Sequence, residues 1–215
     1  MIVRIIKPVI LTAAEKVTRV LTLTASLLLV IPTIAIAQQP DELYRLGNIA
    51  MNRGDITEAM RQLELAAEQG YAPAQSRLGW ILDGAELNGD AVNWYRKAAR
   101  QGDAEGQFGL ASMYLKGEGI EKNNSEAFSW LLQSAQQGYS PAMGLVATAH
   151  EQGLIGVEPN INEALQWIDR GLAADMPWAI QRKAKAWRNG ELGLTPDITR
   201  ADDLDMKLRG LTAKP

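Results

Sequence analysis

Cysteine is absent from this 215-residue chain, and histidine occurs only once. Disulfides, iron–sulfur clusters and thiol nucleophiles all need cysteine, and structural zinc sites are built mainly from cysteine and histidine. The composition therefore excludes a disulfide framework, an iron–sulfur cluster and a cysteine nucleophile. We expect neither a cofactor nor a metal ion.

A surplus of basic residues is lacking as well. The 22 Lys and Arg residues face 25 Asp and Glu residues, which gives a formal net charge of −3. A nucleic-acid surface needs clustered positive charge to replace counterions, so we expect no nucleic-acid partner. With 47% hydrophobic and 22% charged residues, the chain has the balance of an ordinary folded protein.

Sequence motifs of common enzyme classes are also missing. The chain contains neither Ser-x-x-Lys nor Gly-x-Ser-x-Gly, and the glycines at 117 and 119 lack the Lys-Ser or Lys-Thr of a phosphate loop. His150 is interpreted as a packed ring and not as a catalytic base, because it takes the repeat position of Tyr114. We therefore predict that the protein is not an enzyme.

The first 37 residues have the pattern of a secretory signal peptide. Positive charge precedes an uncharged run at 20–37, which ends in Ala35-Ile36-Ala37. This order predicts cleavage after Ala37 and export to the periplasm. The apolar run, about 17 residues, is also near the lower limit of a membrane span, so an uncleaved inner-membrane anchor is the alternative. Removing 1–37 takes away four basic residues and one acidic residue and makes the formal charge −6.

One phrase recurs along the remainder, residues 38–215. Residues 94–102 start with Trp and end with Gly, and related phrases follow at 130–138 and 167–175. The same ending occurs upstream at 66–70, and an alanine lies eleven residues before each of the four ends, at Ala59, Ala91, Ala127 and Ala164. Alanine, then Trp three residues on, then a small residue four further on marks one helix face, and a terminal Gly suits a left-handed cap. Each phrase is predicted to be a capped helix.

A second helix is predicted before each phrase, with glycine turns at 117–120 and 153–157 between the two. A helical hairpin cannot bury its own apolar face, so neighbouring hairpins are expected to stack. The units fall at about 39–70, 71–102, 103–138, 139–175 and 176–215. The recurrent Trp94, Trp130 and Trp167 are predicted to pack between units.

This spacing resembles the Sel1-like repeat, a relative of the tetratricopeptide repeat. The family pattern combines Ala-x3-Leu-Gly-x2-Tyr-x2-Gly-x-Gly-Val with Ala-x2-Trp-x3-Ala-Ala-x2-Gly, and residues 103–138 match it best. The resemblance implies an all-α, right-handed superhelical solenoid of about five helix-turn-helix repeats. It also implies an adaptor that holds a protein, a peptide or occasionally a glycan on the concave face formed by the first helices.

The family register carries the groove positions onto a set of residues in this chain: Tyr44, Asn48, Ser76, Trp80, Phe108, Ser112, Thr148, Gln181 and Lys185. Trp80 and Phe108 stand out as aromatic anchors of the kind found in binding hot spots. Phe108 has the alternative of packing against the next hairpin. Trp178 and Trp187 form either an end-on patch or, as we favour, part of a capping hairpin.

The leading hypothesis is an exported, non-enzymatic scaffold that binds a protein or peptide in the cell envelope and regulates or assembles an envelope complex. The alternative is a cell-wall-associated enzyme or a protein that binds peptidoglycan or another glycan. Sel1-like proteins assigned to that class are typically rich in paired cysteines, which this chain lacks.

Overall fold

The computed structural model describes residues 39–213. This part of the chain is entirely helical, so the predicted all-α class is confirmed. It contains ten helices: α2 (Pro40–Asn52), α3 (Ile56–Glu68), α4 (Ala72–Gly84), α5 (Asn88–Arg100), α6 (Ala104–Lys116), α7 (Asn124–Gln136), α8 (Ser140–Gln152), α9 (Ile161–Ala173), α10 (Pro177–Asn189) and α11 (Ile198–Thr212). The predicted signal segment, 1–37, lies outside the described residues.

The helix starts follow local chemistry. The side chains of Asp55, Asp103 and Asn123 accept hydrogen bonds from backbone N–H groups in the first turns of α3, α6 and α7. Such caps satisfy donors that have no partner inside the helix. In α2, α4, α8 and α10 a proline occupies the first or second position, where its missing N–H is harmless.

The ends of the second helices follow the predicted glycine pattern. Gly102 has φ +87°, and the N–H of Asp103 donates to the carbonyl of Ala98 at 3.1 Å. This is the hydrogen bond of a left-handed helix cap. In the fourth unit Asp175 takes the same place with φ +55°, and Met176 closes the cap on Gly171. The backbone thus repeats even where the glycine has been replaced.

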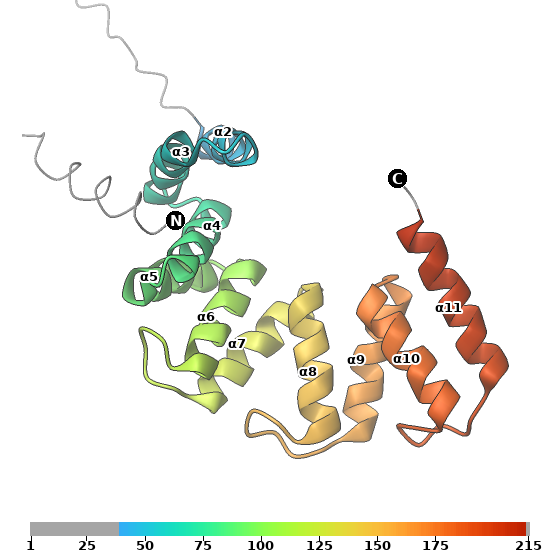
Figure 1. Ribbon diagram of the computed structural model, residues 1–215. Coiled ribbons are helices and arrows are strands. Elements are labelled where there is room, and N and C mark those ends of the chain that lie inside the picture. Colours follow the sequence, from blue (N-terminus) through green and yellow to red (C-terminus); the bar gives the residue numbers. More distant parts are fainter. Residues whose placement is uncertain (1–38, 214–215) are drawn as a thin grey trace, which may run out of the picture.

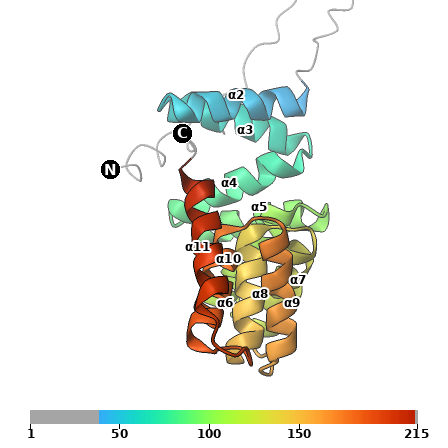
Figure 2. The same ribbon diagram turned by 90° about the vertical axis from the view of Figure 1, so that its right-hand side faces the viewer.

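The helices pair into five hairpins, α2–α3 to α10–α11, which follow one another along an open arc (Figure 1). Seen from the side, α2 crosses the long direction of α8, α9 and α11, so the stack twists along its length (Figure 2). The predicted solenoid of five helical hairpins is therefore confirmed. Among residues 39–213, no helix has both the length and the apolar character that crossing a membrane requires.

The first helices form the inner row of this stack. Each of α4, α6, α8 and α10 contacts the second helix of the preceding hairpin. In addition, α4 contacts α6 directly, whereas no two second helices within 39–213 are in comparable contact. In a curved stack the inner elements lie closer together than the outer ones. We call the solvent-facing side of α2, α4, α6, α8 and α10 the inner face.

The recurrent tryptophans have the packing role that their spacing predicts. Trp94 touches both the core of the first two hairpins and the next core, and Trp130 touches that core and the following one. Trp167 is buried in the last of these cores. His150 is a packed ring as predicted, because its imidazole meets the Phe128 ring edge-on at a centroid distance of 5.6 Å.

Candidate inner-face binding site

One position of each first helix marks the inner face from end to end. It is occupied by Asn48, Trp80, Ser112, Thr148 and Lys185, and none of these side chains is buried. Four of the five are polar, as expected for a line of residues in contact with water. Trp80 is the exception, with 56% of its surface exposed.

Trp80 has little to hold it in this exposed place. Its main polar neighbour is Arg77, one turn earlier on α4, whose guanidinium carbon lies 5.6 Å from the centre of the indole ring. A bulky apolar side chain exposed to this extent on a concave surface is typical of a binding anchor. Trp80 is therefore the strongest of the predicted partner contacts, and its role remains a prediction.

Ser76 is a correction to the predicted set. It is completely buried, and its hydroxyl is committed to the carbonyl of Ala72, at 3.1 Å, and to the carboxylate of Asp103. Asp103 in turn caps α6 through the N–H of Gly106, at 2.7 Å. Ser76 consequently joins α4 to the start of α6 and offers no surface to a partner. The register placed it correctly on the helix, but the burial of that position depends on the next hairpin.

Phe108 and Tyr44 are both half-buried by packing. The Phe108 ring lies 5.3 Å from the ring of Tyr139 and rests on the core of the next two hairpins, which is the alternative given for it above. Tyr44 has the same relation to Tyr71, with ring centres 5.5 Å apart. These aromatic residues join successive hairpins along the inner face.

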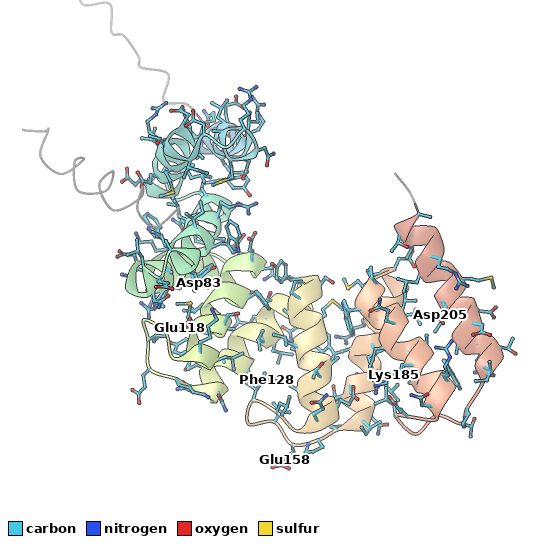
Figure 3. The ribbon with its side chains drawn as sticks, viewed as in Figure 1. Asp83, Glu118, Phe128, Glu158, Lys185 and Asp205 are labelled. Carbon is cyan, nitrogen blue, oxygen red and sulfur yellow. The ribbon has the colours of Figure 1, made fainter. Side chains whose placement is uncertain are left out.

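The C-terminal candidates divide in the same way. Gln181 and Lys185 are exposed on α10, where Figure 3 labels Lys185. Thr148 on α8 lies beside a partly open cavity of about 380 Å³ between α8 and α10. Its lining includes Gly144, Leu145, Ile168 and Trp178. Of the predicted residues, only Thr148 belongs to this cavity.

Trp178 forms one wall of the cavity. Its indole N–H donates to the hydroxyl of Ser140 at 3.1 Å, and its ring packs against both Gly144 and Gly171. A Cβ on Gly171 would lie 2.7 Å from the indole, so the ring fits there only because that residue is glycine. Trp178 therefore belongs to the inner face between α8 and α10, whereas Trp187 stacks on Arg200 at the C-terminal end.

The charged groups beside the cavity are paired with one another. Arg182 makes a two-pronged contact with Glu151, at 2.9 and 2.6 Å, and a third contact with Glu191, at 2.8 Å. The hydrogen bonds with Glu151 are the main cause of the raised pKa of Arg182. The pKa of Glu191 is lowered, chiefly by a hydrogen bond from Asn189. The ion pairs join α8, α10 and the turn after α10.

A second charged group lies on the N-terminal half of the inner face. Burial raises the pKa of Glu105 on α6, while the positive charge of Arg77 opposes this shift and Asp103 reinforces it. Burial also raises the pKa of the nearby Tyr139 phenol.

Among the described residues, no cluster of three or more histidine and carboxylate side chains is placed to hold a metal ion.

Sequence reasoning placed Trp178 in the terminal hairpin but not at this cavity, and it missed Arg182 and the cavity itself. The predicted Thr148 lines the cavity together with Gly144 and Glu151 of the same helix. The missing signal was the size of the residues: Gly144 takes the position held by Phe108 one unit earlier. A glycine where a neighbouring unit has phenylalanine indicates unfilled space.

Comparison with known proteins agrees with the repeat architecture. The family model described as Sel1 repeat matches residues 42–71, 72–103, 104–139 and 140–175. Among solved structures, a Sel1 repeat protein from Oxalobacter formigenes superposes with a TM-score of 0.73 and 25% identity, covering 82% of this chain and 75% of the other. The structural superposition thus covers more than four fifths of this chain.

Two curated relatives are named as regulators. Chitin synthase regulator SKT5 of Saccharomyces cerevisiae is 30% identical over 128 residues, covering 56% of this chain and 18% of the relative. The exopolysaccharide production negative regulator of Rhizobium meliloti is 42% identical over 52 residues, covering 24% of this chain and 19% of the relative. The matches thus span less than a fifth of either relative.

Proposed function

This chain belongs to the Sel1 repeat family, and from that premise we propose that it is a non-enzymatic adaptor that binds a protein or peptide partner on its inner face. The exposed indole of Trp80 carries the proposal, because it interrupts a line of polar side chains. The names of the two relatives, a chitin synthase regulator and an exopolysaccharide production negative regulator, support a regulatory role. A partner that covers Trp80 gains free energy from burying the exposed part of the indole ring.

The proposed place of action is the cell envelope. The positively charged start, the apolar run and the Ala35-Ile36-Ala37 ending support export with cleavage after Ala37. The partner would then be an envelope protein whose activity or assembly the adaptor regulates. Mass spectrometry of the exported protein tests this step: a mature chain starting at Gln38 supports it, and an intact N-terminus in the membrane fraction supports the anchored alternative.

The adaptor role is tested by capture from envelope extracts with Trp80→Ala as the variant. We expect at least a tenfold loss of the captured partner, since hot-spot truncations cost about 2 kcal/mol or more. Met206→Ala is the matched control, because Met206 is 58% exposed and belongs to α11, a second helix of its hairpin. If Trp80→Ala and Met206→Ala both retain the partner, the inner-face assignment is wrong.

A further inference from the structure

We propose that the cavity between α8 and α10 is the anchor site for one uncharged, bulky apolar side chain of an extended peptide segment in the partner. This proposal rests on the adaptor function, because it specifies what the inner face holds. The cavity is independent of Trp80, which lies two hairpins away on α4. The two sites are therefore separable by mutation.

The size and lining of the cavity favour an apolar occupant. Its lining includes the apolar residues Leu145, Ile168, Ala147 and Trp178. Its volume is about 380 Å³. An apolar cavity of about 150 Å³ is already large enough to bind benzene. A leucine, methionine or phenylalanine side chain thus fits, and it would gain roughly 1.5–3 kcal/mol on full burial.

The space exists because of one residue difference between units. Phe108 on α6 and Gly144 on α8 occupy the same repeat position. Phe108 packs on Tyr139 at the start of α8, so a side chain of the protein itself fills the space between α6 and α8. At Gly144 the nearest atom to an added Cβ is Trp178 Cδ2 at 3.5 Å, an ordinary van der Waals distance. The space between α8 and α10 therefore lacks a side chain at the repeat position where Phe108 fills the space between α6 and α8.

The charges at the cavity argue against an ionic occupant. Glu151 and Arg182 are 21% and 20% exposed and already neutralise each other. The hydroxyl of Thr148 donates to the carbonyl of Gly144 at 2.9 Å, and Ser140 accepts from Trp178. A charged side chain entering the cavity would lose its water without gaining a free counter-charge. An uncharged side chain avoids this penalty.

The two sites also set what is expected of the partner. Thr148 and Trp80 hold the same repeat position two units apart. The segment is thus expected to carry two separate apolar residues, one for each site.

The direct test follows the indole N–H resonance of Trp178 in nitrogen-15-labelled exported protein. Trp178→Phe identifies the signal, and the probes are N-acetyl-leucinamide, N-acetyl-phenylalaninamide and N-acetyl-lysinamide. The two apolar probes should shift this signal saturably, with Kd values of about 1–10 mM. The lysine probe should not. Absence of a saturable shift with either apolar probe, or an equal shift with the lysine probe, overturns the proposal.

Gly144→Leu is the blocking variant, because its side chain starts at the cavity wall and occupies the space. Gly210→Leu on α11 is the matched control, since no atom lies within 4 Å of a Cβ added there. Circular dichroism first confirms that both variants are folded. The probe-induced shift should be lost in Gly144→Leu and retained in Gly210→Leu; a retained shift in both contradicts the assignment of the site.

Peptide display against the wild-type protein separates this proposal from the proposed function. Enrichment of peptides with two separate apolar residues supports both proposals when Trp80→Ala abolishes it and Gly144→Leu lowers it tenfold. Enrichment lost in Trp80→Ala but unchanged in Gly144→Leu overturns the cavity proposal and leaves the adaptor function standing. Enrichment unchanged in both variants counts against the inner face itself.

Discussion

The interface between α4 and α6 and the interface between α8 and α10, here called steps, are built on the same repeat. They differ in how completely side chains fill the space between the helices. At α4–α6, Ser76 and Asp103 join the two helices, and the buried ring of Tyr95 fills the space against Gly79 and Gly109. At α8–α10, Gly144 leaves a cavity that Trp178 closes only on one side. The same repeat thus gives a closed joint in one place and an open one in another: α4 and α6 are in direct contact, whereas α8 and α10 are not in comparable contact.

The two steps also differ in their polar contacts. Gln75 and Gln107 donate to the carbonyls of Ala67 and Ala99 in the preceding hairpins, at 3.0 and 3.5 Å. Each also accepts from a glutamine of its own hairpin, Gln101 at 2.7 Å and Gln137 at 2.8 Å. The corresponding first-helix residue on α8 is Met143, and its step is joined by the Trp178–Ser140 hydrogen bond and the Arg182 ion pairs. Glutamine bridges belong to the closed part of the stack, and ion pairs border the open part.

The largest expected effect concerns the two indoles of the inner face. Trp178→Ala should lower the free energy of unfolding by about 2–4 kcal/mol, because it removes the ring packed on Gly144 and Gly171 and a hydrogen bond. Trp80→Ala should change it by less than about 0.5 kcal/mol, since that ring is mostly exposed. Urea titrations of both variants measure this contrast. Equal losses would show that Trp80 also serves the fold.

The same substitution at two glycines should act with opposite sign. Gly109→Ala places a methyl group against the ring of buried Tyr95 and should cost about 1–3 kcal/mol through overpacking. Gly144→Ala adds its methyl group at an ordinary distance from Trp178 and should gain about 0.5–1 kcal/mol from helix propensity. Thermal unfolding of the pair decides the matter. A stabilising Gly109→Ala would disprove the tight joint at α4–α6.

The glutamine pair within the third hairpin should contribute less than the packing at α4–α6. Gln107→Met is expected to cost less than about 1 kcal/mol, because Met143 already fills the same repeat position on α8 and the side chains are similar in volume. The carbonyl of Ala99 keeps its hydrogen bond from Gly102 at 3.0 Å. Urea unfolding measures the change, with Gln137→Met as the exposed partner control. A loss above 2 kcal/mol would assign the bridge a larger role.

The smallest expected effect is a pH dependence at Glu105. Burial raises its pKa in the folded protein, so its stability contribution is fully present below the unfolded value of about 4.3 and is lost as the pH rises through the folded pKa. Glu105→Gln removes this loss. We expect the variant to melt up to about 2 °C higher than wild type at pH 7 and at the same temperature at pH 3.5. A difference that grows on acidification would contradict the sign.

Much of the fold could be predicted because its signals are local. The cap at Gly102 and the spacing of Trp94 and Trp130 depend on residues within one helix and its neighbours in sequence. The burial of Ser76 could not be predicted, since it depends on Asp103 reaching back from the next hairpin. For Phe108 the sequence left packing and binding open, and the ring of Tyr139 decided for packing.

The candidate site shows the same limit. The register identified the exposed line through Trp80 and Thr148, because equivalent helix positions face the same way in every unit. It could not identify Trp178 as a neighbour of these positions, because the ring belongs to the following hairpin and packs against Gly171. Contacts between units join residues about 30 positions apart. A repeat pattern aligns such positions but does not show whether their side chains fill the space between them.

By itself the sequence determined the helices, their caps, the hairpin units and the line of inner-face positions, because each depends on period, capping and turn chemistry within a few residues. Only the tertiary structure decided which of those positions remain accessible. Accessibility is set where two hairpins meet, by whether the side chain of one fills the space left by the other. At Ser76 and Phe108 the space is filled, and at Gly144 it is left as a cavity.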